Sequence, residues 1–418
     1  MEKLRREADA IITAGISAVL PDEAVKKAMK EMPVPSGKLI LVAAGKAAWQ
    51  MAKAAVGEVK ADAGIVITKY DHVKGDLPGL KCFEAGHPVP DQNGFEATAK
   101  VLDLVSNLSE KDLVLFLLSG GGSALFEVPF VSGDELQGIT KQLLACGADI
   151  VEMNTIRKRL SQVKGGRFAE ICSPAQVFTI VLSDIIGDPL DMIASGPAYP
   201  DSSTCQEAMD IVSKYSLKLT DEAIALMNLE TPKTLDNVTT LVTGSVRELC
   251  KAVSTKCEEL GYKSVILTDC LECEARDAGT MLGERIKENI GTGEKLAFIA
   301  GGETVVHLTG NGLGGRNQEI ALAAAPIIAN LDAAVFSFGS DGTDGPTDAA
   351  GGYVDGDSLQ LLEQNGWDVE TALADNDAYH ALSCIDGLIM TGPTGTNVND
   401  VSVALISGDH KSASKSSQ

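Results

Sequence analysis

One local pattern limits the fold of this 418-residue chain more than any other: a short apolar run that ends abruptly in Gly, Ser, Thr or Asp. Runs of four to eight β-prone residues without polar alternation are typical of strands buried on both faces of a parallel sheet. They recur at 39–46, 64–69, 112–123, 177–184, 239–245, 264–269, 296–304, 334–345 and 387–397. Helical patterns lie between several of them, at 46–58, 92–107, 133–150, 246–260 and 317–330. The alternation predicts an α/β fold in which helices cover mainly parallel sheets.

The length and one polar stretch divide the chain into domains. At about 150 residues per domain, 418 residues suggest two. The stretch 216–238 is polar, contains Pro232 and separates two sets of strands. We therefore expect α/β domains at 1–232 and 233–406, followed by a small polar tail at 407–418 that is disordered. The first residues are expected to form a helix that packs on a sheet.

The charge balance excludes several classes of partner. Thirty-five Lys and Arg against 58 Asp and Glu give a formal net charge of −23. Because so acidic a surface repels polyphosphate backbones and anionic lipids, neither nucleic acid nor a membrane is an expected partner. No uncharged apolar run approaches the ~20 residues that span a bilayer, and the nine Cys are scattered, so we expect a cytoplasmic protein. An anionic substrate would need a few local cations, helped by a divalent metal.

Two candidate anion-binding segments follow apolar runs directly. Lys46 ends the run 39–46 and opens a helical pattern, where backbone N–H groups and the helix dipole favour an anion; a solvated lysine is the alternative. The segment 117–125 carries three consecutive glycines between two serines, which lets the backbone approach a ligand closely. A flexible turn is the alternative there, but its position straight after an apolar strand favours a binding loop.

The densest basic cluster lies at 154–167, within a chain that is otherwise acidic. On a helix, Asn154, Arg157, Lys158 and Ser161 would share one face, and Lys164 would lie at the C-terminal end of the helix. Such a run is usually a solvated face. The local reversal of charge favours anion binding instead.

Two segments concentrate carboxylates at predicted strand ends. Residues 182–197 contain Asp184, Asp188 and Asp191, which could hold Mg²⁺ or accept a proton from a substrate hydroxyl. Residues 339–352 contain three more Asp, for which a purely structural loop is an equal alternative.

The segment 310–316 matches the dinucleotide pattern GxGxxG between a strand-like and a helix-like segment. Arg316 follows the last glycine at once, however, and no acidic residue ends the next predicted strand at the expected distance. We therefore interpret these glycines as a turn that presents the Arg316 guanidinium. No GxSxG motif occurs, so acyl transfer has little support, and each His is expected to be structural.

Taken together, eight motifs in order resemble the class II glycerate kinases, or MOFRL family, over about residues 1–406: AGKAA, LSGGGSAL, VKGGR, SDIIGDPLDMIASGP, GGET, GLGGRNQE, GSDGTDGPTDAAGG and GPTGTNVND. The resemblance implies two α/β domains with an active site in the cleft between them. It also implies transfer of the ATP γ-phosphoryl group to D-glycerate with Mg²⁺, generally giving 2-phosphoglycerate. It leaves open whether the chain forms a homodimer.

The resemblance assigns roles residue by residue. Lys46 matches the family's essential lysine and Arg316 its essential arginine, while Asp184 and Asp188 match an acidic motif that serves catalysis or holds the metal. The family's Gly-rich nucleotide loop corresponds to Ser119, Gly120, Gly121, Gly122 and Ser123. For the glycerate carboxylate or the ATP phosphates, the basic run offers Asn154, Lys158 and Lys164.

Two other functions compete with this prediction. The GxGxxG match suggests an NAD(P)-dependent hydroxypyruvate reductase, which nicotinamide absorbance would reveal. The Gly-rich loops also suit a phosphosugar-sensing or scaffold module that binds anions without turnover, which glycerate-dependent ADP release would exclude.

Overall fold

The computed structural model describes residues 2–183, 185, 187 and 189–408. These residues form two compact units. The first unit holds 21–183 and 189–243, and the second holds 2–20, 185, 187 and 244–408. The units differ from the expected domains at three places: the chain passes to the second unit after 243, and both the N-terminal residues and residues 185 and 187 belong to the second unit. The reason is visible in the sheets, since the strand that begins at Val238 still pairs with the first sheet.

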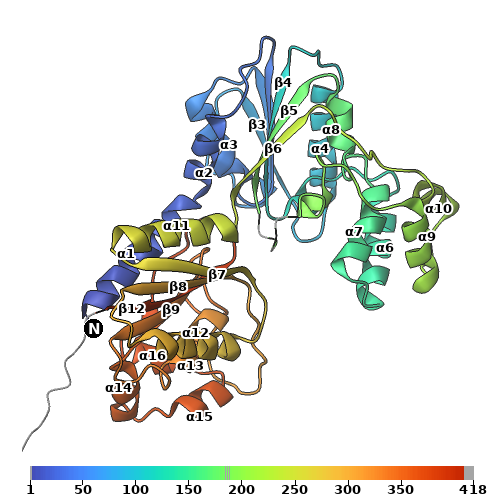
Figure 1. Cartoon of the computed structure of the whole chain (residues 1–418). Helices are drawn as coiled ribbons and strands as arrows, with labels where there is room; N and C mark the ends of the chain where they lie inside the picture. The colour runs from blue at the N-terminus through green and yellow to red at the C-terminus, as the bar shows by residue number, and fades with distance from the viewer. Residues whose placement is uncertain (1, 184, 186, 188, 409–418) are drawn as a thin grey trace, which may run out of the picture. The chain divides into compact units, whose positions relative to one another are not determined.

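The first unit is built on a six-stranded sheet with the order β3-β2-β1-β4-β5-β6 (Figure 1). The strands are β1 (Leu39–Ala44), β2 (Ala63–Lys69), β3 (Leu80–Ala85), β4 (Leu113–Ser119), β5 (Gln176–Leu182) and β6 (Val238–Gly244). The pairs β1–β2, β1–β4, β2–β3 and β4–β5 are all parallel, as the buried apolar runs predicted. Because β1 and β4 are neighbours, the loops that follow Ala44 and Ser119 emerge side by side at one sheet edge.

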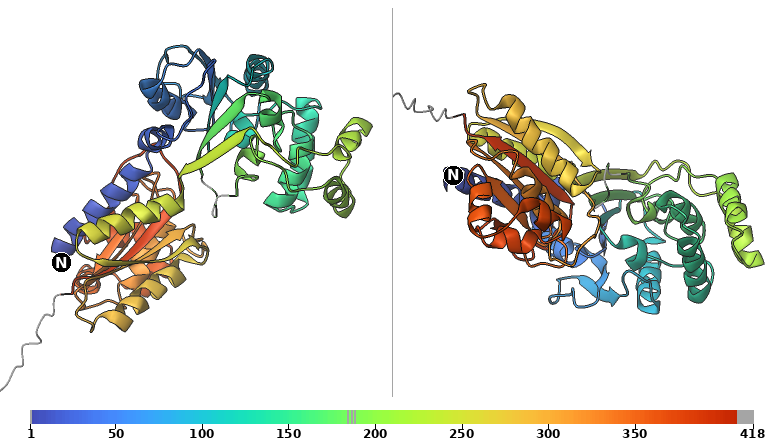
Figure 2. Two further views of the ribbon diagram at one scale, coloured as in Figure 1. Left: turned by 45° about the horizontal axis from the view of Figure 1, so that its top comes forward. Right: turned by 90° about the horizontal axis from the view of Figure 1, so that it is seen from below.

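Helices cover this sheet, and a helical cluster stands beside it (Figure 2). On one face α2 (Pro21–Met29) and α3 (Ala48–Glu58) pack on apolar side chains of β1 and β4. The cluster consists of α6 (Gly133–Ala145), α7 (Ile150–Arg159), α9 (Cys205–Lys214) and α10 (Asp221–Met227), which share one apolar core. The other helical segments of this unit are α4 (Gln92–Val105), α5 (Gly122–Leu125), α8 (Arg167–Cys172) and the 3₁₀ turn η1 (Ile193–Ser195).

The second unit contains a mixed sheet with the order β11-β10-β9-β12-β8-β7. Its strands are β7 (Lys263–Leu271), β8 (Leu296–Gly302), β9 (Ala333–Gly339), β10 (Gly351–Asp355), β11 (Leu388–Ile389) and β12 (Asp400–Ile406). Only the pair β7–β8 is parallel, so the expected α/β class holds but this sheet is not mainly parallel. A short helix-free connection joins β9 to β10, and such connections produce antiparallel pairs.

Helices also cover both faces of the second sheet (Figure 1). On one face α1 (Glu2–Ala18) and α11 (Val246–Glu259) lie side by side, and α12 (Ala275–Asn289) and α13 (Arg316–Ala324) pack on the other. The leading helix therefore packs on a sheet as expected, through buried apolar residues three or four positions apart. The helices α14 (Ser358–Gln364), α15 (Val369–Ala374) and α16 (Ala378–Ser383) complete this unit. No helix in the described ranges is long and apolar enough to cross a bilayer.

Candidate functional site

In the first unit, hydrogen bonds hold the loops after β1 and β4 together. The Lys46 amide donates to the Gly120 carbonyl at 2.9 Å, and the Ala47 amide donates to the Ser119 hydroxyl at 3.1 Å. The loop that carries Lys46 is therefore fixed against the Gly-rich segment 119–123. The structure brings together the lysine and the Gly-rich segment that sequence reasoning nominated separately.

The Lys46 side chain is exposed, and its ammonium makes no hydrogen bond or ion pair with any residue the structure describes. It flanks Gly121, which has φ +84°. A Cβ atom at Gly121 would lie 3.0 Å from the His87 ring and 3.2 Å from Lys46 Cγ, so only glycine fits this position without strain. The His87 ring and the Lys46 side chain therefore both lie close to the backbone at Gly121.

Sequence reasoning did not predict that His87 lies against the Gly-rich segment. Each His was expected to be structural because none lies near a hydrolase-type Ser and Asp. The available signal was its position just after β3, at the same sheet edge as Lys46 and Gly121, but β3 itself was not predicted.

The turn at 193–196 packs against the Gly-rich loop. Ala194 and Ser195 have φ of +50° and +61°, although neither is glycine, and a Cβ atom on Gly122 would meet Ala194 Cβ at 2.7 Å. The amides of Gly165 and Gly166 donate to the carbonyls of residues 195 and 196 at 3.0 and 2.8 Å. Two consecutive non-glycine residues in the left-handed region cost about 1–2 kcal/mol each, so the surrounding structure must hold them, and such strain concentrates at functional sites.

Asn154 and Lys158 lie on α7 beside this turn, but both are nearly buried. The Ser195 hydroxyl donates to Asn154 Oδ1 at 2.8 Å. Lys158 Nζ donates to Asp201 at 3.0 Å and to the more exposed Asp191 at 3.4 Å. Asn154 therefore supports the strained turn, and the charge of Lys158 is balanced within the protein.

Lys164 is fully buried and lies 2.6 Å from Glu127, which is fully buried as well. It also donates to the Phe126 carbonyl at 3.0 Å. Burial, partly offset by the Glu127 charge, lowers the pKa of Lys164 to about 8. This arrangement explains Lys164 as a structural ion pair rather than as the expected ligand contact.

Arg157, from the same basic run, contacts the Gly-rich segment. Its Nη2 donates to the Ser123 carbonyl at 2.9 Å and thereby fixes the far end of the segment 119–123. Of the predicted carboxylates, Asp184 and Asp188 lie outside the described residues, so the structure does not place them.

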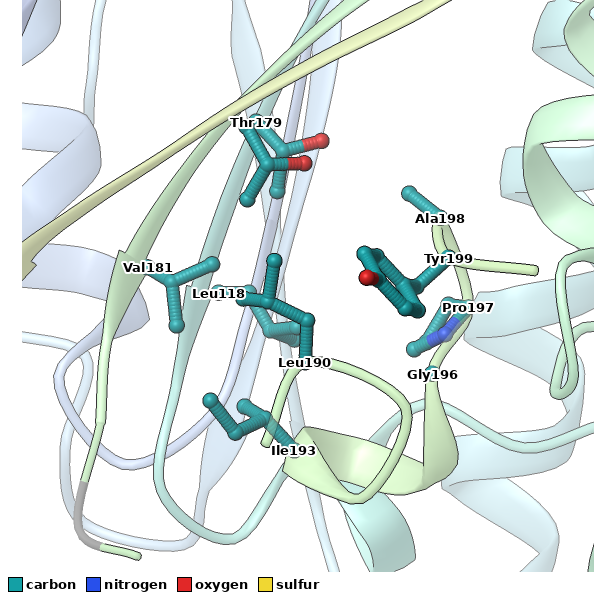
Figure 3. Close-up of a pocket in the computed structure, with 10 residues that line it drawn as sticks. Leu118, Thr179, Val181, Leu190, Ile193, Gly196, Pro197, Ala198 and Tyr199 are labelled. Carbon is teal, nitrogen blue, oxygen red and sulfur yellow. The ribbon is translucent and has the colours of Figure 1, made fainter. Parts of the chain in front are cut away.

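An apolar hollow adjoins the Gly-rich loop (Figure 3). It lies between β4, β5 and the segment that follows the turn, and its wall includes Leu118, Val181, Ile193 and Tyr199. The free space at its centre is about the size of a water molecule. A nucleobase therefore does not fit in this conformation.

In the second unit, Arg316 is the first residue of α13. Its Nε and Nη2 donate to the two carboxylate oxygens of Asp400, at 3.2 Å for Nη2, and its Nη1 lies 3.2 Å from Glu303 Oε1. The turn before α13 thus presents a guanidinium, as the sequence predicted, and two carboxylates hold it.

Asp344 fastens the start of α13. Its carboxylate accepts hydrogen bonds from the amides of Asn317 and Gln318 at 3.2 and 2.9 Å. Burial raises the pKa of Asp344 to about 6, in spite of these bonds. Its role is thus structural, and within the described ranges no group of three His, Cys, Asp or Glu could hold a metal ion.

The GxGxxG segment does not form a dinucleotide turn. β8 ends at Gly302 and α13 begins at Arg316, so the glycines do not lie in a tight strand-to-helix connection. A Cβ atom at Gly310 would lie 2.3 Å from Asp375 Cα, and one at Gly312 would lie 2.4 Å from Asp377 Cβ. The glycines let this loop pack closely on the turn between α15 and α16.

Fold and site together define a class: an α/β protein that presents a lysine beside a Gly-rich loop in one unit and a carboxylate-held arginine in the other. Family models match a domain of unknown function (DUF4147) at residues 7–228 and the MOFRL family at residues 296–400. A D-glycerate 2-kinase of Thermotoga maritima is 49% identical over 97% of this chain and 99% of its own length. A glycerate 2-kinase of Pyrococcus horikoshii is 40% identical over 88% of each chain.

A crystal structure of glycerate kinase from Thermotoga maritima superposes with a TM-score of 0.93 at 48% identity, covering 97% of this chain and all of that one. The chain belongs to the MOFRL family of glycerate kinases.

Proposed function

We propose that this chain transfers the γ-phosphoryl group of ATP to D-glycerate, giving 2-phosphoglycerate and ADP. The observation that carries the proposal is the exposed Lys46 ammonium beside the Gly-rich loop, in a chain 49% identical to a D-glycerate 2-kinase. Phosphoryl transfer asks little covalent chemistry of the protein. It requires positioning of the two substrates and stabilisation of charge on the phosphoryl oxygens.

Each residue has a role in this reaction. The segment 119–123 holds the ATP phosphates through its amides, and Lys46 neutralises charge on the phosphoryl group that moves. Arg316 stabilises the same charge from the second unit. The glycerate hydroxyl oxygen forms the new P–O bond while the bond to the β-phosphate oxygen breaks, and the hydroxyl proton passes to a carboxylate, for which we propose Asp184 or Asp188.

Asn154 acts by holding the turn at 193–196, and Lys158 by holding Asp191 at the edge of the site. We propose that Mg²⁺ would arrive with ATP and that, of Asp184 and Asp188, the carboxylate that does not accept the proton would supply a protein oxygen, the ligand that this ion prefers. The acidic surface and the proposed substrates fit a cytoplasmic enzyme. We also propose that the chain forms a homodimer, which light scattering would test.

The direct test couples ADP release to a spectroscopic readout, with and without D-glycerate, and identifies the product by phosphorus NMR. We expect ADP release that depends on D-glycerate and a 2-phosphate product. Release that is independent of glycerate would contradict the proposal. Oxidation of NADH by hydroxypyruvate would instead support the reductase alternative.

A further inference from the structure

The sheet topology of the second unit places a buried carboxylate under Arg316. β12 runs antiparallel between β8 and β9, so its first residue, Asp400, pairs with Gly302 and with Gly339 at the ends of those strands. The helix that begins with Arg316 starts at this same edge. Neither glycine has a side chain, which leaves room for a carboxylate and a guanidinium to meet over the strand ends.

The two carboxylates that hold Arg316 differ in exposure. The Asp400 side chain is 8% exposed, whereas that of Glu303 is 48% exposed. Asp400 accepts from Nε and Nη2, a side-on pair that fixes the plane of the guanidinium. Glu303 contacts only Nη1. The inner edge of the guanidinium is therefore fixed, and its outer edge faces a carboxylate in contact with solvent.

The Arg316 guanidinium has N–H donors that remain available for a substrate. A guanidinium carries five N–H donors. Asp400 engages two and Glu303 one, so two stay available, and displacing Glu303 would release a third. Phosphoryl oxygens match this fork geometry. A phosphoryl group that arrives at the outer edge would take the place of Glu303 without disturbing Asp400.

We propose that Asp400 is the positioning residue for Arg316, and that Glu303 is an exchangeable counter-ion which the phosphoryl group displaces. This inference rests on the proposed role of Arg316 in phosphoryl transfer. Asp400 orients the arginine and touches no substrate. Glu303 balances the guanidinium charge until the phosphoryl group takes its place.

A double-mutant cycle tests the positioning role. Misplacing a catalytic group by about 1 Å costs roughly 100-fold in rate, so Asp400→Asn should lower kcat by about 10- to 100-fold and change the KM for ATP little. In an Arg316→Ala background the same substitution should add no further loss, because Asp400 acts only through Arg316. Losses that multiply in the double variant would overturn the proposal.

Asp355→Asn is the matched control. Asp355 is a buried carboxylate at the end of β10, where it pairs with the start of β9. Asp400 pairs with the end of β9, so the two carboxylates lie at opposite ends of that strand. The Asp355→Asn substitution should leave kcat unchanged. A kcat for Asp400→Asn equal to that of Asp355→Asn would contradict the positioning role.

A chemical readout keeps the test independent of turnover. Phenylglyoxal modifies accessible arginines, and mass spectrometry of the Arg316 peptide gives the labelling rate. Asp400→Asn should raise this rate severalfold and Asp355→Asn should not; an unchanged rate would contradict the proposed clamp. A wild-type enzyme that labels as expected but does not phosphorylate glycerate would refute the proposed function alone.

Glu303→Gln tests the exchange. Removing a carboxylate that competes with phosphate should lower the KM for ATP severalfold while kcat stays near the wild-type value. A raised KM for ATP would show that Glu303 is not displaced and would overturn that part of the proposal.

Discussion

The buried pair of Lys164 and Glu127 yields a sharp test of the first unit, because the sequence nominated Lys164 as a ligand contact. Both side chains are fully buried and 2.6 Å apart. Removing one partner of such a pair leaves an uncompensated charge and costs about 3–5 kcal/mol. Since Arg157 also interacts with Glu127, we expect Lys164→Met to fall near the lower end, at about 3 kcal/mol.

The loss can be measured in this unit alone. Trp49 lies in α3 and the only other tryptophan, Trp367, lies in the second unit, so urea unfolding in a Trp367→Phe background reports the first unit. For a unit of this size, about 3 kcal/mol corresponds to a fall in Tm of roughly 6–12 °C.

The double variant Lys164→Met/Glu127→Leu separates structure from binding. Replacing a whole buried ion pair by apolar residues is often neutral or stabilising, so the double variant should recover most of the lost stability. It should also retain the wild-type KM for ATP. A Lys164→Met variant with wild-type stability but weakened ATP binding would refute this reasoning and restore the ligand role.

Two further predictions concern the nucleotide loop and α13. Gly121→Ala should raise the KM for ATP at least about tenfold, because the new Cβ atom displaces His87 and Lys46. The left-handed backbone at this position should lower the free energy of unfolding by only about 1–2 kcal/mol. An unchanged KM for ATP would contradict the geometry. The pKa of Asp344 is raised in the folded state, so between about pH 4 and 6 the folded state binds the extra proton and unfolding free energy falls as pH rises. Asp344→Asn should flatten that slope, measured by Trp367 fluorescence after Trp49→Phe, and an equal slope in both proteins would disprove the shift.

Most of the first sheet was predictable from the sequence because its strands are buried on both faces. Runs such as 113–119 have no polar residue to suggest any other environment. Two of the strands that were not predicted, β3 and β10, lack such an apolar run. β3 lies at the sheet edge and carries a charged residue at every few positions, and β10 begins with two glycines.

Apolar runs in the sequence do not show whether the strands of the second sheet pair in parallel or antiparallel. β12 was not predicted, and it pairs antiparallel with both β8 and β9, just as β10 pairs antiparallel with β9 and β11. Pairing partners are set by tertiary packing rather than by the sequence of one strand. For the same reason the sequence nominated Arg316 but gave no sign that Asp400, 84 positions later, would hold it.

Burial also explains why the basic side chains at 154–167 differ from the sequence-based expectation. Lysines at 158 and 164 have the same sequence signature as a solvated or ligand-binding face, but the fold turns both inward towards carboxylates. Arg157 was expected on the same helix face as Asn154 and Lys158, and the structure shows that it donates a hydrogen bond to the Gly-rich loop at Ser123. Sequence spacing identifies which side chains share a helix face but not what that face meets.

The central claim is that Lys46 and Arg316 act on one phosphoryl group. The most direct measurement is the kcat for D-glycerate phosphorylation by Lys46→Ala and by Arg316→Ala, with Lys60→Ala and Arg285→Ala as controls because these two side chains lie at the surface. We predict a loss of about 100-fold or more in each of the first two variants, both of which should remain folded under assay conditions, and no loss in the controls. Near-normal turnover in either Lys46→Ala or Arg316→Ala would contradict the account.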